Sequence, residues 1–197
     1  MKKNLIRLSC LLLLAFASCK SCKKDVAPVD QLPPETQTGA NTAGALIDGV
    51  AWMPRVTTGG KATTGGYVKT SVNGSRNAFL MTMYQRNTGE ASKDLQVYAL
   101  SVYAPGRYPL SFDTGIDWGQ PNTKSYGLYS VYGKMLNDPD YNYITTSTKT
   151  GYVNFTVADT TNKLFAGTFE FEAIDNPSGK TIKVSGGRFD LNLNTLR

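Results

Sequence analysis

The sequence predicts an all-β protein, and three features of its 197 residues support that prediction. Apolar and polar side chains alternate along short runs, most clearly in the last third of the chain. After position 45, no run of eleven or more residues free of Gly and Pro has the i, i+3, i+4, i+7 spacing of an amphipathic helix. Clusters of Gly, Asn, Asp and Pro, which are typical of turns, separate the runs. We therefore expect an antiparallel β-sandwich of about ten strands, with a lipocalin-like up-and-down barrel as the alternative.

The first 18 residues have the features of a secretory signal peptide. Three basic residues lie among the first seven, residues 8–17 form an apolar run, and the small residues Ala17 and Ser18 close it. This order of charge, apolar run and small residues is that of an export signal. A helix of about ten residues rises only about 15 Å, roughly half of a bilayer core, so we do not expect a membrane-spanning helix.

The three cysteines, Cys10, Cys19 and Cys22, all lie at the N-terminal end. The tetrapeptide Phe16-Ala17-Ser18-Cys19 resembles the lipobox of bacterial lipoproteins, whose cysteine carries a diacylglycerol and becomes the mature N-terminus. This resemblance implies lipidation of Cys19 and an anchor in the outer membrane of the cell envelope, on its periplasmic or its outer side. Cys22 fits less well, because Lys20 and Cys19 would then stand where small apolar residues are usual.

Residues 19–42 are expected to be a lipid-anchored, disordered tether, and residues 43–197 the folded domain. The tether has three prolines, almost no aromatic residues and no sustained periodicity. Such a composition favours a flexible chain with a reach on the order of 25 Å.

The first two thirds of the domain contain seven expected strands. Two expected hairpins have Asp48-Gly49 and Asn73-Gly74 at their turns, because both dipeptides suit tight turns. The seven strands are expected over residues 45–47, 50–52, 67–72, 78–84, 95–103, 125–132 and 141–146.

Two further strands follow, over residues 153–157 and 165–171. Val153, Phe155 and Val157 alternate with polar residues, as do Phe169 and Phe171 in the second strand. Each alternating set should face the core, and Glu170 and Glu172 should then face water. Turn residues at 159–162 and 176–179 separate the strands and imply consecutive hairpins.

The last strand, residues 182–193, changes the parity of its apolar side chains. Ile182 and Val184 share one parity, whereas Phe189 and Leu191 share the other. An extra residue between the two sets would keep both on one face, so we predict a β-bulge at residues 185–187.

Composition excludes several kinds of chemistry. The chain has no histidine, and none of its cysteines follows position 22. Catalysis by Ser-His-Asp or Cys-His, zinc sites of His or Cys and haem on an axial His are therefore excluded from the domain. The basic residues are scattered, which argues against nucleic-acid binding. We expect a monomer that is not an enzyme, with no cofactor and no metal.

A long connection is the candidate ligand site. It contains carboxylates, an amide and an indole, a mixture suited to stacking and hydrogen-bonding a sugar or a peptide. The candidate residues are Asp113, Asp117, Trp118, Asn122 and Tyr126. The alternative is that Tyr126 and the other tyrosines of this region line the core, with their hydroxyl groups at its rim.

Two acidic patterns have simpler explanations than catalysis or metal binding. Asp138, Asp140 and Asn142 have the spacing with which a calcium loop begins, but the rest of the loop pattern is missing, so a turn is expected. Glu170 and Glu172 would suit a glycosidase pair, but their position on the solvent face already explains them.

Several short phrases of the domain look like those of uncharacterised lipoproteins of Bacteroidetes, which are grouped as domains of unknown function. The phrases are residues 45–52, 106–110, 151–156, 167–171 and 185–189. The resemblance implies an all-β extracytoplasmic domain behind a lipid anchor, and it brings no catalytic residues. The function expected is a binding or interaction module for a glycan, a peptide or an envelope partner. The alternatives are a lipocalin-like carrier of a small apolar ligand and, third, a hydrolase that works without histidine.

The lipid anchor is directly testable. Cells that express the protein should incorporate labelled palmitate into it, and Cys19→Ala should abolish both the label and membrane fractionation, because the acylated thiol is lost. Labelling that survives Cys19→Ala and is lost in Cys22→Ala would assign the anchor to the other cysteine.

Overall fold

The computed structural model describes residues 26–57, 59–70, 76–111, 124–135 and 137–196. Within these ranges the secondary structure is β, apart from one 3-10 turn, η1 (Pro28–Gln31). The strands are β1 (Thr42–Ile47), β2 (Val50–Trp52), β3 (Arg55–Val56), β4 (Thr63–Thr70), β5 (Arg76–Arg86), β6 (Lys93–Leu100), β7 (Gly106–Leu110), β8 (Tyr126–Val131), β9 (Tyr141–Ile144), β10 (Gly151–Asp159), β11 (Leu164–Ile174) and β12 (Thr181–Asn192).

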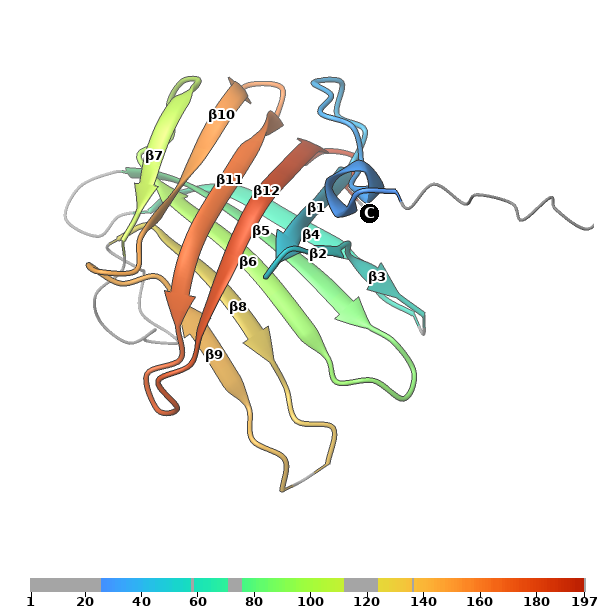
Figure 1. The fold of residues 1–197 in the computed structure, drawn as a ribbon. Coiled ribbons are helices and arrows are strands. Elements are labelled where there is room, and N and C mark those ends of the chain that lie inside the picture. Colours follow the sequence, from blue (N-terminus) through green and yellow to red (C-terminus); the bar gives the residue numbers. More distant parts are fainter. Residues whose placement is uncertain (1–25, 58, 71–75, 112–123, 136, 197) are drawn as a thin grey trace, which may run out of the picture.

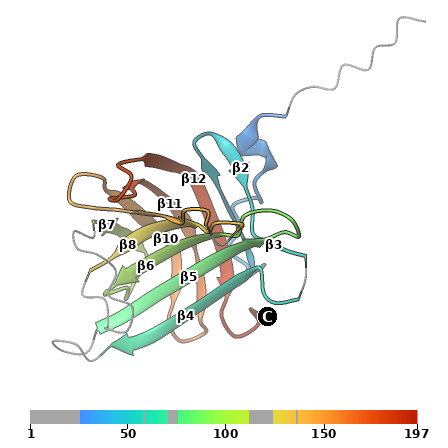
Figure 2. The same cartoon turned by 90° about the horizontal axis from the view of Figure 1, so that it is seen from below.

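The strands form two packed layers, as the sequence predicts. One layer has the order β7-β10-β11-β12-β1-β2, and the other contains β9-β8-β6-β5-β4. Figures 1 and 2 show the two layers crossing at an angle. The two layers are joined by the pairing of Ile174, at the end of β11, with Ile144 of β9. The short strand β3 pairs with β5 in parallel. The sheet does not close into a barrel, so the sandwich is confirmed and the barrel alternative is not.

All ten expected strands are present, and the structure adds β3 and β7. Of these two, β3 is only two residues long. Strand β7 contains Gly106 and Pro109, which normally interrupt a strand. Pro109 is tolerated because β7 lies at the edge of its layer and pairs only with β10.

The Asp48-Gly49 turn is confirmed. It joins β1 to β2, and both residues have positive φ, 49° and 82°, as a type I′ hairpin turn requires. The other expected turn, Asn73-Gly74, lies outside the described residues, although the strands on either side of it, β4 and β5, are antiparallel.

The predicted bulge in β12 is also confirmed. Phe169 of β11 lies opposite Gly187, whereas Phe171 lies opposite Val184, so β12 has one extra residue at this point. Gly186 takes a φ of 56°, which glycine adopts without strain. As a result, Val184 and Phe189 both reach the core despite their different parity.

A second bulge, in β10, was not predicted, and it shows that the expected core position of Val157 is wrong. Phe155 pairs with Gly167 and Val157 with Ala166, so Thr156 is an extra residue in β10. The bulge reverses the parity of the strand, and Ala158 rather than Val157 packs against the core. Val153 and Phe155 are buried as expected.

Aromatic rings fill the space between the layers. Phe79 of β5 contacts Phe155 edge-on, with ring centroids 5.0 Å apart, and stacks on Phe189 at 5.6 Å. Phe171 packs over Gly127 of β8, where a Cβ atom would lie 2.6 Å from the ring. Gly127 is therefore required by the close approach of the two layers at this point.

Part of the segment that the sequence predicts to be a disordered tether packs on the domain. Leu32 is 6% exposed, and residues 32–41 lie against the first layer. The reason is a set of hydrogen bonds to a distant carboxylate, described below. Among the described residues, no helix is long and apolar enough to cross a membrane.

The packing of Phe171 predicts a large stability loss on truncation. Phe171 is 2% exposed, so Phe171→Ala should lower the free energy of unfolding by about 3 to 5 kcal/mol, because it leaves a cavity beside Gly127. Glu170 faces water on the same strand, and Glu170→Gln should change the free energy of unfolding by less than about 0.5 kcal/mol. Urea denaturation of the two variants measures both values, and a neutral Phe171→Ala would contradict the assigned core.

Candidate functional site

Residues 32–41, here called the strap, are held by one buried carboxylate. Asp190 of β12 is 1% exposed and accepts five hydrogen bonds from the strap. The donors are the Thr36 hydroxyl (2.6 Å), the Thr38 amide (2.9 Å) and hydroxyl (3.3 Å), the Gly39 amide (2.7 Å) and the Ala40 amide (3.2 Å). The strap is therefore ordered by a residue far away in the sequence.

The same contacts set the ionisation of Asp190. Burial alone would raise the pKa of this carboxyl group, but the bonds from Thr36, Thr38, Gly39 and Ala40 outweigh it, and the pKa lies below its usual value. The carboxylate is thus charged at neutral pH and acts as an acceptor for the strap.

Both ends of the strap are fixed as well. Leu32 lies beside the β12 bulge at Gly186, and the Pro33 carbonyl accepts a hydrogen bond from Arg188 at 3.2 Å. At the other end Asn41 has a φ of 58°, and its side-chain oxygen accepts from the Asn192 amide at 2.9 Å. The Asn41 amide group donates to the Thr195 hydroxyl at 3.1 Å, which ties the C-terminal turn to the strap.

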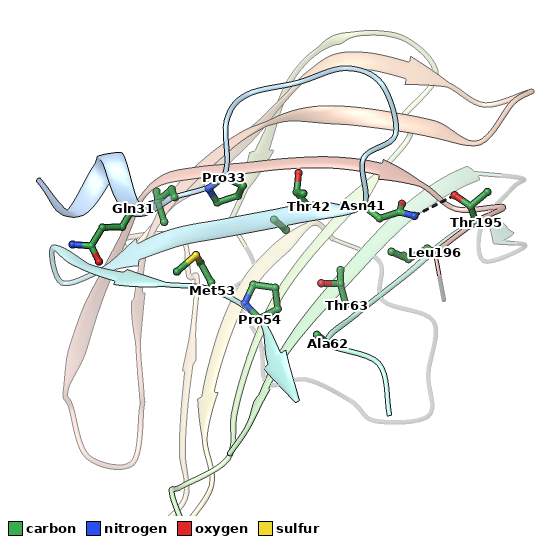
Figure 3. Close-up of a pocket in the computed structure, with 12 residues that line it drawn as sticks. Gln31, Pro33, Asn41, Thr42, Met53, Pro54, Ala62, Thr63, Thr195 and Leu196 are labelled. Atoms are coloured by element: carbon green, nitrogen blue, oxygen red, sulfur yellow. Dashed lines mark hydrogen bonds between the residues drawn. The ribbon is translucent and has the colours of Figure 1, made fainter. Parts of the chain in front are cut away.

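A groove opens beside the strap, between it and the two layers (Figure 3). Its volume is about 520 Å³. It is lined by Gln31, Leu32, Pro33, Asn41, Thr42, Ala43, Met53, Pro54, Ala62, Thr63, Thr195 and Leu196. In Figure 3 the Asn41–Thr195 hydrogen bond lies at one end of the groove and Gln31 at the other. Segments from both ends of the chain thus meet here.

The chemistry of the groove is neutral. None of its lining residues is Asp, Glu, Lys, Arg or Tyr, so the walls offer no charge and no general acid or base. They offer amide and hydroxyl groups beside apolar surface, such as that of Met53 and Leu196. A groove of this kind suits an uncharged ligand that makes hydrogen bonds.

Four of the five residues predicted from the sequence, Asp113, Asp117, Trp118 and Asn122, lie outside the described residues. The fifth, Tyr126, is 3% exposed, and its ring stacks on Tyr98 at 5.2 Å. Its hydroxyl group donates to Gln96 at 3.4 Å, and burial raises its pKa to about 12. Tyr126 therefore has the contacts of a packed side chain.

The tyrosines of this region divide between two clusters. Tyr129 and Tyr143 belong to the main core, 6.2 Å apart between centroids. Tyr126 and Tyr98 belong to a second apolar cluster with Leu128 and Ile144, on the other side of the same layer. The alternative expectation, that the tyrosines of this region line the core, agrees with the burial of Tyr126, Tyr129 and Tyr143. Tyr126 lies in the second cluster because residues of opposite parity in β8 face opposite sides of the layer.

Asp138 and Asp140 are used within their own turn. Asp138 accepts a hydrogen bond from the Met135 amide at 2.9 Å, and Asp140 accepts one from the Gly133 amide at 2.6 Å. The side-chain oxygen of Asn142 accepts from Ser130 at 2.7 Å. Over the described ranges, no group of three or more His, Cys, Asp or Glu is placed to hold a metal ion.

Glu170 and Glu172 face solvent on β11, as predicted. They border a second hollow of about 260 Å³, together with Arg107, Tyr152 and Lys183. Glu172 accepts a hydrogen bond from Lys149 at 3.0 Å, and this bond and the charge of Lys149 lower its pKa. A glycosidase acid needs the opposite shift, because it must keep its proton near neutral pH.

The groove was missed from the sequence because the strap resembles a linker. Residues 36–40 are Thr, Gln, Thr, Gly and Ala, which contain no large apolar side chain. Nothing local shows that their donors converge on Asp190. The one available signal is Asp190 itself, an acidic residue between Phe189 and Leu191 in a strand with apolar neighbours.

No protein-family model, curated protein or solved structure matches this chain.

Acid should release the strap. Because the pKa of Asp190 is lowered on folding, its contribution to stability is complete above the unfolded value of about 4 and is lost as the pH falls towards the folded value. The protection of the Thr38, Gly39 and Ala40 amides from hydrogen exchange, taken relative to the intrinsic exchange rate at each pH, should fall below about pH 4.

Asp190→Asn should cause the same release at neutral pH and cost about 3 kcal/mol, because an amide nitrogen cannot accept the strap bonds. Asp159→Asn, at an exposed turn aspartate, is the control and should leave exchange in the strap unchanged. Slow strap exchange in Asp190→Asn would contradict the role given to this carboxylate.

Proposed function

We propose that the protein is a lipid-anchored binding module of the bacterial cell envelope, and that the groove is its ligand site. The observation that carries the proposal is the groove itself, about 520 Å³ in volume, with a neutral, hydrogen-bonding lining. Its size falls in the range of sites that bind small molecules and short chain segments. The ligand class is an uncharged glycan or peptide of the envelope, presented alone or by a partner protein.

The anchor supports an envelope function. The lipobox-like sequence before Cys19 predicts attachment to the outer membrane, as in the lipoproteins of Bacteroidetes that the domain resembles. About 12 residues separate Cys19 from Gln31 at the groove, and an extended chain spans at most about 3.5 Å per residue. The groove would then stay within about 40 Å of the membrane surface, where envelope polymers are concentrated.

Binding is favoured over catalysis by the ionisable groups. The groove lining contains none, and Glu172 on the other hollow is paired with Lys149, which keeps it charged. This argues against a hydrolase. A carrier of a small apolar ligand is less well supported, because the rings of Phe79, Phe155 and Phe189 occupy the space between the layers.

The proposal is tested by blocking the groove. Ala62 lines it immediately before β4, so Ala62→Trp should fill part of its volume and weaken binding at least tenfold. Val68 lies within β4, is exposed and does not line the groove, so Val68→Trp is the matched control. The full chain in detergent is titrated with neutral oligosaccharides and capped neutral peptides, with charged analogues as competitors.

Binding that survives Ala62→Trp, or that prefers the charged analogues, would contradict the proposal. So would the absence of binding by every neutral probe. Thermal unfolding of the two tryptophan variants checks that a loss of binding does not come from a loss of folding.

A further inference from the structure

We infer that the ligand is an extended, uncharged peptide segment, which adds as a strand to the free edge of β1. The inference rests on the proposed function and gives it a ligand class. Three observations carry it: β1 is paired on both sides over only part of its length, the backbone of Ala43 points into the groove, and the lining has neither charge nor aromatic rings.

The first half of β1 has one neighbour. On one side, β1 pairs with β12 from Thr42 to Ile47. On the other side it pairs with β2 only over its last three residues, as far as Ala45 opposite Trp52. The chain then leaves through Met53 and Pro54 to β3, which pairs with β5 of the other layer. The edge of residues 42–44 is thus left without a strand beside it.

The direction of the Ala43 backbone follows from alternation along the strand. The Asp48 amide donates to the Lys183 carbonyl at 2.9 Å, so the backbone N–H group of residue 48 points towards β12. The backbone N–H and C=O groups of residues 47, 45 and 43 then point the other way, because these groups alternate in direction from one residue of a strand to the next. The N–H and C=O groups of Ala43 therefore face the groove.

Pro54 keeps this position open. If the register of β1 and β2 continued past Ala45 and Trp52, Pro54 would lie opposite Ala43. A proline has no N–H group to donate to the Ala43 carbonyl, and the chain turns away at this point. Among the described residues, the structure places no backbone partner on this side of Ala43. Ala43 is 5% exposed, and buried backbone groups without a partner are costly.

An extended peptide supplies what Ala43 lacks, one C=O and one N–H group at strand spacing. Binding by strand addition to a free edge is a known mode of peptide recognition. A glycan fits less well, because no Trp, Tyr or Phe lines the groove to stack on a sugar ring. A charged peptide would lose hydration without gaining a partner, since the groove offers no opposite charge.

The strand geometry also determines which side chains of the peptide face the core. Residues directly opposite each other in antiparallel strands have side chains on the same face of the sheet. Ala43 faces the core, so the peptide residues that hydrogen-bond to it should be apolar and face inward. A suitable probe is the capped peptide acetyl-Thr-Val-Thr-Val-Thr-amide, with its valines inward.

The experiment compares two N-methylated forms of this probe. Methyl groups on both valine nitrogens remove the N–H group that would bond to Ala43, whichever valine lies opposite it. Methyl groups on the second and third threonine nitrogens remove N–H groups that point away. Titration of the full chain in detergent, followed by fluorescence anisotropy of the labelled peptides, should show at least fivefold weaker binding for the valine-methylated form, since one net hydrogen bond corresponds to about that change. The threonine-methylated form should bind within twofold of the parent.

Each outcome decides the inference. Equal binding of the two methylated forms, or a preference for the valine-methylated form, overturns strand addition. Binding of a neutral oligosaccharide that Ala62→Trp abolishes, with no binding of the peptide, overturns the peptide class and leaves the proposed function standing. No binding by either kind of probe overturns both.

Discussion

The Asp190 carboxylate is the interaction on which the rest of the site depends. It lies in the last strand and accepts all five of its strap bonds from residues that precede the first strand. A buried charge is stable only where such donors surround it, so β12 and the strap each need the other. The contact joins the two ends of the chain, and the groove lies where they meet, since its walls include Gln31 and Leu196.

The bulge in β12 contributes in two ways. It brings Val184 and Phe189 to the same core, which the change of parity along the strand made predictable. It also places Gly186 beside Leu32, where the strap begins. The first effect could be predicted from the sequence because apolar parity is a local pattern. The second could not, because the partner of Gly186 lies in a segment with the composition of a linker.

The same distinction explains the other successes and failures of the sequence analysis. Alternation placed all ten expected strands, and Asp48-Gly49 marked its turn, because these signals are local. The bulge at Thr156 leaves no trace in composition, so Val157 was assigned to the wrong face. The candidate loop was selected for its residue types, and its described member, Tyr126, packs against Tyr98. Residue type alone does not show which side of a layer a side chain faces.

The groove results from the way the strands pair, and not from particular side chains. Strand β2 ends at Trp52, Pro54 prevents its ladder from continuing, and the following residues cross to the other layer as β3. This leaves the edge of β1 open at Ala43, and the strap closes one side of the opening. A site built from backbone groups needs few distinctive side chains, which is why its lining of Thr, Asn, Ala and Pro has no motif to detect. The strap that forms its wall also leads towards Cys19, so the segment that orders the groove is the one through which an anchored domain would meet its membrane.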